Sequence, residues 1–177
     1  MDPKMELTQR AARIKLMIFD VDGVLTDGSL HYGADGEALK TFNVHDGLGI
    51  KLLQESGVKT AIISARKSPQ VTRRAADLGI EFLHQGGHDK LTPFNSLLAQ
   101  TCLTAEEVGF IGDDLVDLPI LARVGLAVSV PNGRPDVISR AHHVTQAAGG
   151  RGAVREVCEL LLKAQGNYDK IMAQFLV

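Results

Sequence analysis

The feature that most constrains the fold is an alternation of short apolar runs with longer segments of helical periodicity. The apolar runs are rich in Val, Ile, Leu and Phe, which is typical of parallel strands buried on both faces. The pattern therefore predicts an α/β protein with a Rossmann-like, doubly wound parallel sheet and helices on both faces. The expected strands are residues 14–19, 59–64, 81–83, 108–111 and 126–130, and the expected helices are residues 47–55, 69–78, 90–100, 115–123 and 153–163.

One segment interrupts this alternation directly after the first expected strand. Two short strand-like pieces flank a turn between Gly33 and Gly36, which predicts a β-hairpin in place of a crossover helix. Ligands of open α/β sheets bind beyond the carboxyl ends of the strands. We therefore expect the hairpin, at about residues 27–43, to form a small flap beside the site. No other insertion is long enough for a lid domain, so the fold is expected to be capless.

Length, charge and cysteine content narrow the class of protein. The 177 residues predict one domain over residues 1–177, with a C-terminal tail at about residues 164–177. A net charge of -2 with no basic block argues against nucleic-acid binding. No apolar run approaches a membrane span or a signal-peptide core. Cys102 and Cys158 form no CxxC motif, which is typical of a reducing compartment, so we expect a cytoplasmic protein without membrane partners.

Two carboxylates follow the first expected strand. Asp20 and Asp22 are two residues apart, and on an extended chain their side chains face the same way. Like charges at this spacing need a cation or a shared proton. Gly23 permits a sharp turn, and Thr26 can add a hydroxyl to the same pocket. The pair predicts a divalent metal site, with a solvated Asp/Gly turn as the alternative.

A second acidic cluster, Asp113, Asp114 and Asp117, follows the fourth expected strand and precedes a helix. Acids at a helix N-terminus are also explained by capping, which can account fully for Asp114. Two carboxylate clusters at the carboxyl ends of parallel strands are nevertheless expected to converge on one crevice. Oxygen ligands of this kind suit Mg²⁺, which also accepts a phosphate oxygen.

Two polar residues at other strand ends complete a possible phosphoryl site. Ser64 ends the second expected strand, and Lys90 opens a helix. A hydroxyl and an ammonium group suit a phosphoryl group, whose charge must be neutralised as its bond breaks. Each residue has an ordinary alternative, because Ser64 can cap the following helix and Lys90 can be surface charge.

These pieces, in this order, resemble the four motifs of the haloacid dehalogenase superfamily of phosphohydrolases. The resemblance implies that Asp20 is the nucleophile and that Asp22 protonates the leaving oxygen and later activates water. It also implies that Ser64 and Lys90 hold the phosphoryl oxygens. Mg²⁺ would be bound by the Asp20 side chain, the Asp22 backbone carbonyl and Asp113, with Asp114 and Asp117 outside the ligand set. An aspartate can attack a phosphate dianion only when cations suppress their repulsion.

A closer resemblance covers nearly the whole chain. The hairpin, the segment Asn43 to Gly47, the stretch from Ser64 to Arg66 and the sequence GDDLVDLP look like the capless, tetrameric phosphatases that act on 3-deoxy-D-manno-octulosonate 8-phosphate. In that family the sugar acid phosphate is expected to contact the positions matching Asp22, Asn43, Val44, His45, Asp46, Gly47, Lys51, Arg66, Arg74 and Lys90.

This substrate class agrees with the charges of the chain. The guanidinium groups of Arg66 and Arg74 can donate to the carboxylate of a 2-keto sugar acid, with ordinary helix-surface charge as the alternative. The resemblance also implies a homotetramer in which a neighbour's tail approaches the site. Exposed apolar residues of the tail would favour such an assembly, namely Ile171, Met172, Phe175 and Leu176.

Three other functions are weighed against this one. The first is a phosphatase for a nine-carbon, sialic-type acid phosphate, which the sequence distinguishes poorly from a phosphatase for the eight-carbon substrate. A non-catalytic, phosphatase-like oligomerisation module has no need for the whole reactive set of Asp20, Asp22, Lys90 and Asp113. A receiver-type signalling domain also uses a phosphorylated Asp, but it does not need the second carboxylate at Asp22.

Overall fold

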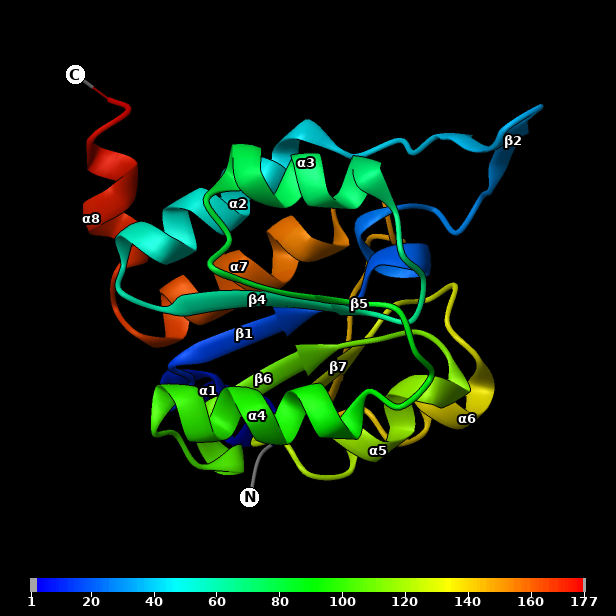
Figure 1. The fold of residues 1–177 in the computed structure, drawn as a ribbon. Helices are drawn as coiled ribbons and strands as arrows, with labels where there is room; N and C mark the ends of the chain where they lie inside the picture. The colour runs from blue at the N-terminus through cyan, green and yellow to red at the C-terminus, as the bar shows by residue number, and fades with distance from the viewer. Residues whose placement is uncertain (1–2, 177) are drawn as a thin grey trace.

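The computed structural model, which describes residues 3–176, has a six-stranded sheet at its centre. Its strand order is β5-β4-β1-β6-β7-β8, and every neighbouring pair is parallel. The predicted doubly wound parallel sheet is therefore confirmed (Figure 1). The strands are β1 (Leu16–Phe19), β4 (Lys59–Ser64), β5 (Phe82–Gln85), β6 (Val108–Ile111), β7 (Leu126–Ser129) and β8 (His143–Val144).

Helices cover both faces of this sheet (Figure 1). One face carries α2 (Val44–Glu55), α3 (Pro69–Leu78) and α7 (Ala153–Ala164), and the other carries α4 (Leu91–Thr101), α5 (Leu118–Leu121) and α6 (Pro135–Ile138). Two further helices, α1 (Pro3–Ala12) and α8 (Tyr168–Ala173), pack against α7. None of the helices within residues 3–176 has the length and apolar character needed to cross a membrane.

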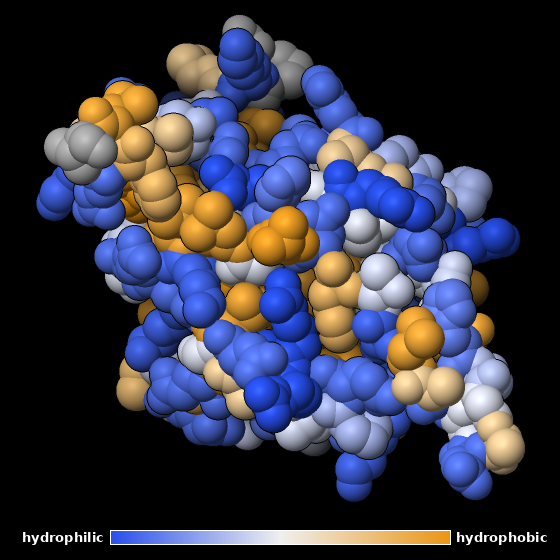
Figure 2. Space-filling model, turned by 90° about the horizontal axis from the view of Figure 1, so that it is seen from above, coloured by the Kyte–Doolittle hydropathy of each residue, from blue (hydrophilic) through white to orange (hydrophobic). Residues whose placement is uncertain are grey.

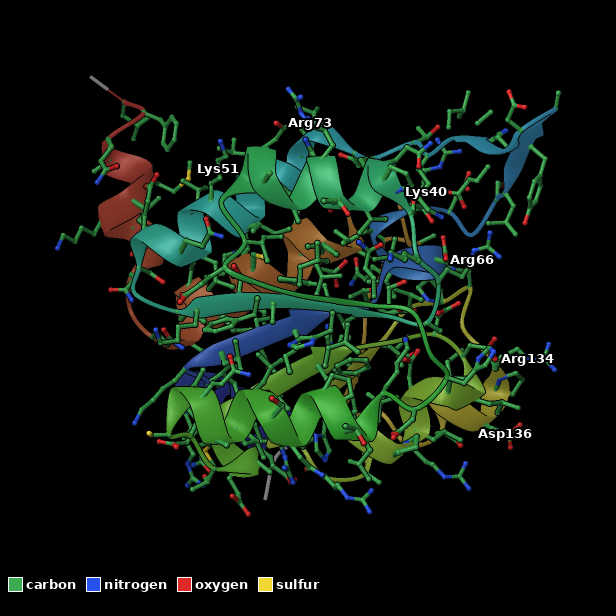
Figure 3. The ribbon with its side chains drawn as sticks, in the orientation of Figure 1. Lys40, Lys51, Arg66, Arg73, Arg134 and Asp136 are labelled. Atoms are coloured by element: carbon green, nitrogen blue, oxygen red, sulfur yellow. The ribbon has the colours of Figure 1, made fainter. Side chains whose placement is uncertain are left out.

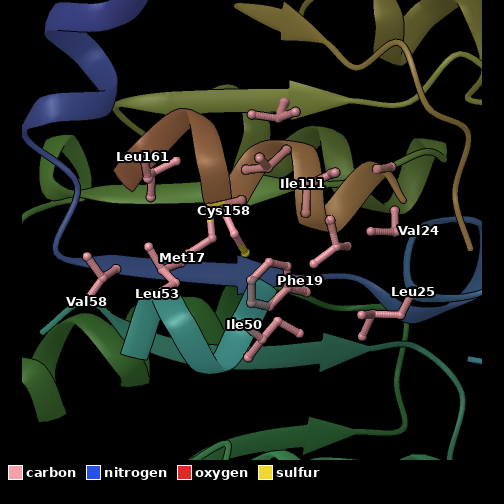
Figure 4. Close-up of a cluster of buried hydrophobic side chains, with 14 of the residues drawn as sticks. Met17, Phe19, Val24, Leu25, Ile50, Leu53, Val58, Ile111, Cys158 and Leu161 are labelled. Atoms are coloured by element: carbon pink, nitrogen blue, oxygen red, sulfur yellow. The ribbon is translucent and has the colours of Figure 1, made fainter. Parts of the chain in front are cut away.

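The central strand β1 separates two apolar cores. Phe19 packs in one core with Ile50 of α2 and Leu161 of α7 (Figure 4). Ile18 points the opposite way and packs with Phe94 of α4. Successive side chains of a strand alternate between faces, so a strand covered on both sides must be apolar throughout. The four residues of β1 are all buried, and the polar residues that follow them mark the edge of the sheet.

Several predicted boundaries are wrong for local reasons. Helix α2 begins at Val44 rather than at residue 47, because the Asn43 side chain accepts a hydrogen bond of 2.8 Å from His45 N and caps the helix. The expected helix over 115–123 is divided into a 3₁₀ turn, Leu115–Asp117, and the short α5. Expected strand 14–19 begins at Leu16. Helices α1, α6 and α8 were not predicted from the sequence.

The segment between β1 and α2 contains the hairpin β2 (His31–Gly33) and β3 (Gly36–Leu39), which pair antiparallel. It projects from the carboxyl-terminal edge of the sheet (Figure 1). Its action as a flap stays a prediction. That residues 1–177 form one domain also stays a prediction, and residues 1, 2 and 177, including the end of the expected tail, lie outside the described part of the chain.

Candidate active site

The chain turns sharply where β1 ends, and this turn carries the first two acids. Asp20 N donates to Ile111 O at 3.1 Å, which holds Asp20 against the end of β6. Gly23 then has a φ of +88°, a conformation that favours glycine. The two carboxylates line one cavity, and each contacts a different lysine. Asp20 contacts Lys90, whereas Asp22 contacts Lys40.

That cavity has a volume of about 380 Å³ and lies at the carboxyl ends of the strands. It brings together the predicted catalytic and metal-binding residues from four separate stretches of the chain, as expected for an open α/β sheet. Thr26 is an exception to the prediction. Its hydroxyl is buried and accepts hydrogen bonds from Gly23 N and Gly28 N at 3.4 Å and 3.2 Å, so it braces the turn. The lining includes Asp20, Asp22, Ser64, Arg66, Lys90, Asp113 and Asp114.

Lys90 is the cation at the floor of the site. Its buried ammonium group lies 2.7 Å from Asp20 Oδ1 and 2.6 Å from Asp117 Oδ1. Burial alone would lower the pKa of Lys90, but the two carboxylates outweigh burial and raise it. Lys90 is therefore charged throughout the neutral pH range. The alternative of surface charge is excluded by this burial.

Asp117 organises the second acidic cluster. Its side chain is 0% exposed, and its Oδ2 accepts hydrogen bonds from Asp113 N at 3.0 Å and Asp114 N at 3.2 Å. Both Asp117 oxygens thus have partners inside the protein. Asp114 caps the following turn by accepting from Leu115 N at 2.7 Å, as the capping interpretation anticipated. Of the two cluster acids that line the cavity, Asp113 is therefore the one whose carboxylate does not cap this turn.

The residues at this edge fit a divalent cation. Carboxylate oxygens of Asp20, Asp113 and Asp117 lie within 4.8 Å of one another, and the buried Asp113 Oδ1 lacks a hydrogen-bond partner. A Cβ atom at Gly23 would lie only 2.1 Å from Asp113 Oδ2, so the turn closes tightly on this carboxylate. Since both Asp117 oxygens are already bonded, Asp20 and Asp113 are the side chains that best suit Mg²⁺.

The crowding of these acids changes their protonation. Burial and the charges of Asp117 and Asp114 raise the pKa of Asp113 to about 7. Burial and the charge of Asp117 also raise the pKa of Asp20 well above its ordinary value, although Lys90 opposes that shift. Buried carboxylates that repel one another are stabilised by a bound cation. The electrostatics therefore agree with the geometry.

The hairpin segment supplies two charged residues beside the site that were not predicted as site residues, Glu37 and Lys40. The ammonium group of Lys40 contacts the Asp22 carboxylate and lies 3.2 Å from Glu37 Oε2. Arg66 lies between the same two acids, with its Nε 3.6 Å from Asp22 Oδ2 and its Nη2 3.2 Å from Glu37 Oε2. The one available signal was the position of Glu37 and Lys40 on a hairpin segment that was already expected beside the site.

The other predicted substrate contacts do not line this cavity. Asp46 is 1% exposed, and its Oδ1 accepts a hydrogen bond of 2.8 Å from Arg155 N, so its side chain joins α2 to α7. The Arg74 guanidinium donates to Asn43 O at 3.3 Å. Lys51 lies toward the opposite end of the α2–α3 layer from Arg66 (Figure 3). The residues that fall outside the cavity lining are Asn43, Val44, His45, Asp46, Gly47, Lys51 and Arg74.

Comparisons with known proteins agree with this geometry. A family model described as haloacid dehalogenase-like hydrolase matches residues 81–157. The 3-deoxy-D-manno-octulosonate 8-phosphate phosphatase KdsC of Escherichia coli (strain K12) is 48% identical over 96% of this chain and 90% of its own length. The chain belongs to this phosphatase family. The resemblance expected from the sequence motifs is confirmed.

Solved structures of this family superpose closely on the chain. The Moraxella catarrhalis phosphatase, in complex with magnesium ion, phosphate ion and a KDO molecule, is 45% identical with a TM-score of 0.94 over 96% of this chain and 98% of that one. The cobalt-bound Haemophilus influenzae phosphatase is 44% identical with a TM-score of 0.91, covering 96% of this chain and 100% of that one. The family likeness thus extends to the fold.

Proposed function

We propose that this chain is a Mg²⁺-dependent phosphomonoesterase that hydrolyses 3-deoxy-D-manno-octulosonate 8-phosphate to the free sugar acid and phosphate, a step in lipopolysaccharide precursor synthesis. The observation that carries the proposal is the meeting of Asp20, Lys90 and Asp113 in one cavity of a chain from this phosphatase family. A scaffold module would gain nothing from three repelling acids gathered beside a buried lysine.

Mg²⁺ would be held by the Asp20 side chain, the Asp22 backbone carbonyl and Asp113. When bound, the ion neutralises charge on the phosphoryl oxygens and on the attacking carboxylate. Lys90 already lies against Asp20 and neutralises charge from the other side. Ser64 lines the same cavity and offers a hydroxyl to a phosphoryl oxygen.

The residues then divide the reaction into two displacements at phosphorus. In the first, the Asp20 carboxylate attacks, the bond to the ester oxygen breaks, and Asp22 gives its proton to the departing sugar oxygen. In the second, Asp22 takes a proton from water, the water oxygen attacks phosphorus, and the aspartyl-phosphate bond breaks. Phosphate leaves, and both aspartates return to their starting states.

The predicted sugar-acid contacts favour a site shared between copies. Arg66 lines the cavity, whereas Lys51 and Arg74 do not. If both groups contact one substrate, the second group comes from a neighbouring subunit of the expected homotetramer. Exposed apolar side chains support such contacts: Val44, Phe175 and Leu176 are exposed, and apolar residues gather beside the C-terminal segment (Figure 2). Ile171, expected to be exposed, is buried, so α8 belongs partly to the core.

Phosphate release from a panel of sugar phosphates, with Mg²⁺ and with EDTA, tests the proposal. The panel includes the eight-carbon substrate and a nine-carbon sugar acid phosphate. We expect turnover of the eight-carbon ester with Mg²⁺ and none with EDTA. Turnover confined to the nine-carbon ester, or none on any ester, would contradict the substrate assignment. Analytical ultracentrifugation at working concentration tests the tetramer, and a cytoplasmic location is proposed with the rest.

A further inference from the structure

The hairpin segment and the turns that follow β1 and β4 bring four charged side chains together: Asp22, Glu37, Lys40 and Arg66. Only Lys40 is nearly inaccessible, whereas the side chains of Glu37, Asp22 and Arg66 are 12%, 23% and 40% exposed. Two are acids and two are bases, so the cluster is neutral. Lys40 lies at its centre, because its ammonium group contacts Asp22 and lies 3.2 Å from Glu37 Oε2. The side chain of Lys40 is only 1% exposed, which is rare for a lysine unless it is paired.

Strand β3, which leads to Lys40, is hydrogen-bonded to residues at the start of α3. Ser68, buried at the start of α3, donates from its hydroxyl to Glu37 Oε1 at 2.7 Å. Gln70 Nε2 donates to the backbone oxygens of Glu37 and Ala38, each at 3.3 Å. Strand β2, by contrast, is exposed along its length. Strand β3, which leads to Lys40, is therefore bonded to the start of α3 through Glu37 and Ala38.

Lys40 also affects how Asp22 and Glu37 contact Arg66. The guanidinium lies nearer Glu37, at 3.2 Å from Nη2 to Oε2, than Asp22, at 3.6 Å from Nε to Oδ2. Without the ammonium group of Lys40, Glu37 would compete for Arg66 and Asp22 Oδ1 would lose its contact. With Lys40 present, Asp22 Oδ1 is held by the ammonium group. Asp22 Oδ2, which is 3.6 Å from Arg66 Nε and makes no hydrogen bond to it, is left to carry the proton. This arrangement sets the direction of the carboxylate at the cavity wall.

A purely stabilising role does not explain this cluster. Buried ion pairs are costly to desolvate, and apolar residues of similar size hold a hairpin at least as well. This desolvation penalty is offset by function where a reacting carboxylate must be held in one orientation, since a displacement of about 1 Å can lower the reaction rate by about 10²-fold. Lys40 is the nearly inaccessible member of this cluster, and it contacts the carboxylate that must be oriented.

We propose that Lys40 is a positioning residue of the reaction: with Glu37 behind it, Lys40 holds the Asp22 carboxylate in the orientation from which it protonates the leaving oxygen. The proposal rests on the role of Asp22 given under the proposed function. It makes the hairpin part of the acid/base apparatus, in addition to any action as a flap over the substrate.

The test compares esters that differ in their need for a proton. Glycerol 3-phosphate releases a strongly basic alkoxide, whereas p-nitrophenyl phosphate releases a stable phenolate, and neither carries the sugar carboxylate. Since kcat/KM covers every step up to the departure of the alcohol, it reports the protonation by Asp22. For Lys40→Met, which keeps the apolar stem, we expect a loss of about 10²-fold on the alkyl ester and about 3-fold or less on the aryl ester.

Three further variants isolate the cause. Lys40→Arg retains a cation and is expected to restore most of the alkyl-ester activity. In an Asp22→Asn background, Lys40→Met is expected to add no further loss, because the two residues act through one interaction. Lys15→Met is the matched control, since Lys15 pairs with Glu107 at 2.6 Å just before β1, at the other end of the sheet. It is expected to leave both activities unchanged.

The outcomes separate this proposal from the proposed function. Equal losses on both esters, or an additive loss in the Asp22→Asn background, would show that Lys40 acts through folding or binding and would overturn the proposal. If wild-type protein with Mg²⁺ hydrolyses neither these esters nor the sugar acid phosphate, the proposed function fails first. Far-ultraviolet circular dichroism and a thermal melt identify any variant whose loss comes from misfolding.

Discussion

Removing the charge of Asp113 should stabilise the metal-free protein at high pH. Burial and neighbouring acids raise the pKa of this carboxyl from an ordinary 3.8 to about 7. Between those two pH values the native protein therefore holds a proton that the unfolded chain has released. Under that condition the free energy of unfolding falls as pH rises. The stability that the bound proton of Asp113 contributes is fully present below about pH 4 and is lost as the pH rises to about 7.

The size of the effect follows from the same two values. At about 1.4 kcal/mol for each pH unit, the interval from 3.8 to about 7 integrates to roughly 4 kcal/mol of lost stability by pH 8. Asp113→Asn keeps the shape and removes the charge, so it should recover about 2–4 kcal/mol at pH 8 and little at pH 4. The substitution removes the repulsion of the Asp113 charge by Asp117 and Asp114, but Asp117 itself stays buried.

Urea unfolding in EDTA at several pH values between 4 and 8.5 measures this difference. Comparing the variant with wild type at each pH cancels contributions from histidines and other acids. Addition of Mg²⁺ at pH 8 should then stabilise wild type and leave Asp113→Asn almost unchanged. A variant that is no more stable than wild type at pH 8 without metal would refute the repulsion among these acids and, with it, the electrostatic argument for the metal site.

Three further predictions concern activity. Asp20→Asn should lower turnover by more than about 10³-fold while the oligomer measured by analytical ultracentrifugation is unchanged; retained activity would remove the nucleophile assignment. Arg66→Ala should raise KM for the sugar acid phosphate by roughly 10–100-fold with a much smaller effect on an aryl phosphate, and equal effects would contradict carboxylate recognition. Gly23→Ala forces a Cβ to 2.1 Å from Asp113 Oδ2, so the Mg²⁺ concentration for half-maximal activity should rise about 10-fold or more; an unchanged Mg²⁺ titration would count against the site at this turn.

The positions of most strands along the chain were accessible from sequence, because a strand buried on both faces is apolar at every position. Residues 59–64 and 108–111 coincide with β4 and β6. Acids placed at the ends of such strands converge by topology alone, which explains why Asp20 and Asp113 were expected together. Boundaries that depend on a capping side chain, such as Asn43 before α2, were less accessible.

The assignment of carboxylates to partners required the tertiary structure. Asp20 and Asp22 differ by two positions, yet one pairs with Lys90 and the other with Lys40. Asp46 belongs to the segment expected to contact substrate, but its side chain is bonded to Arg155 N on α7. Nothing in the residue types distinguishes a buried structural acid from a reactive one. The distinction arises from which neighbours the packing brings near.

The sequence by itself determined the α/β class, the chain order of the strands and the edge at which the acids gather, because these follow from local apolar pattern and from the geometry of parallel sheets. Only the tertiary structure decided that Asp117 holds Lys90 in place and that Lys40 of the hairpin reaches Asp22. Those pairs join residues far apart in the chain, and their energies depend on distance and desolvation in the folded protein. No local pattern of residues carries that information.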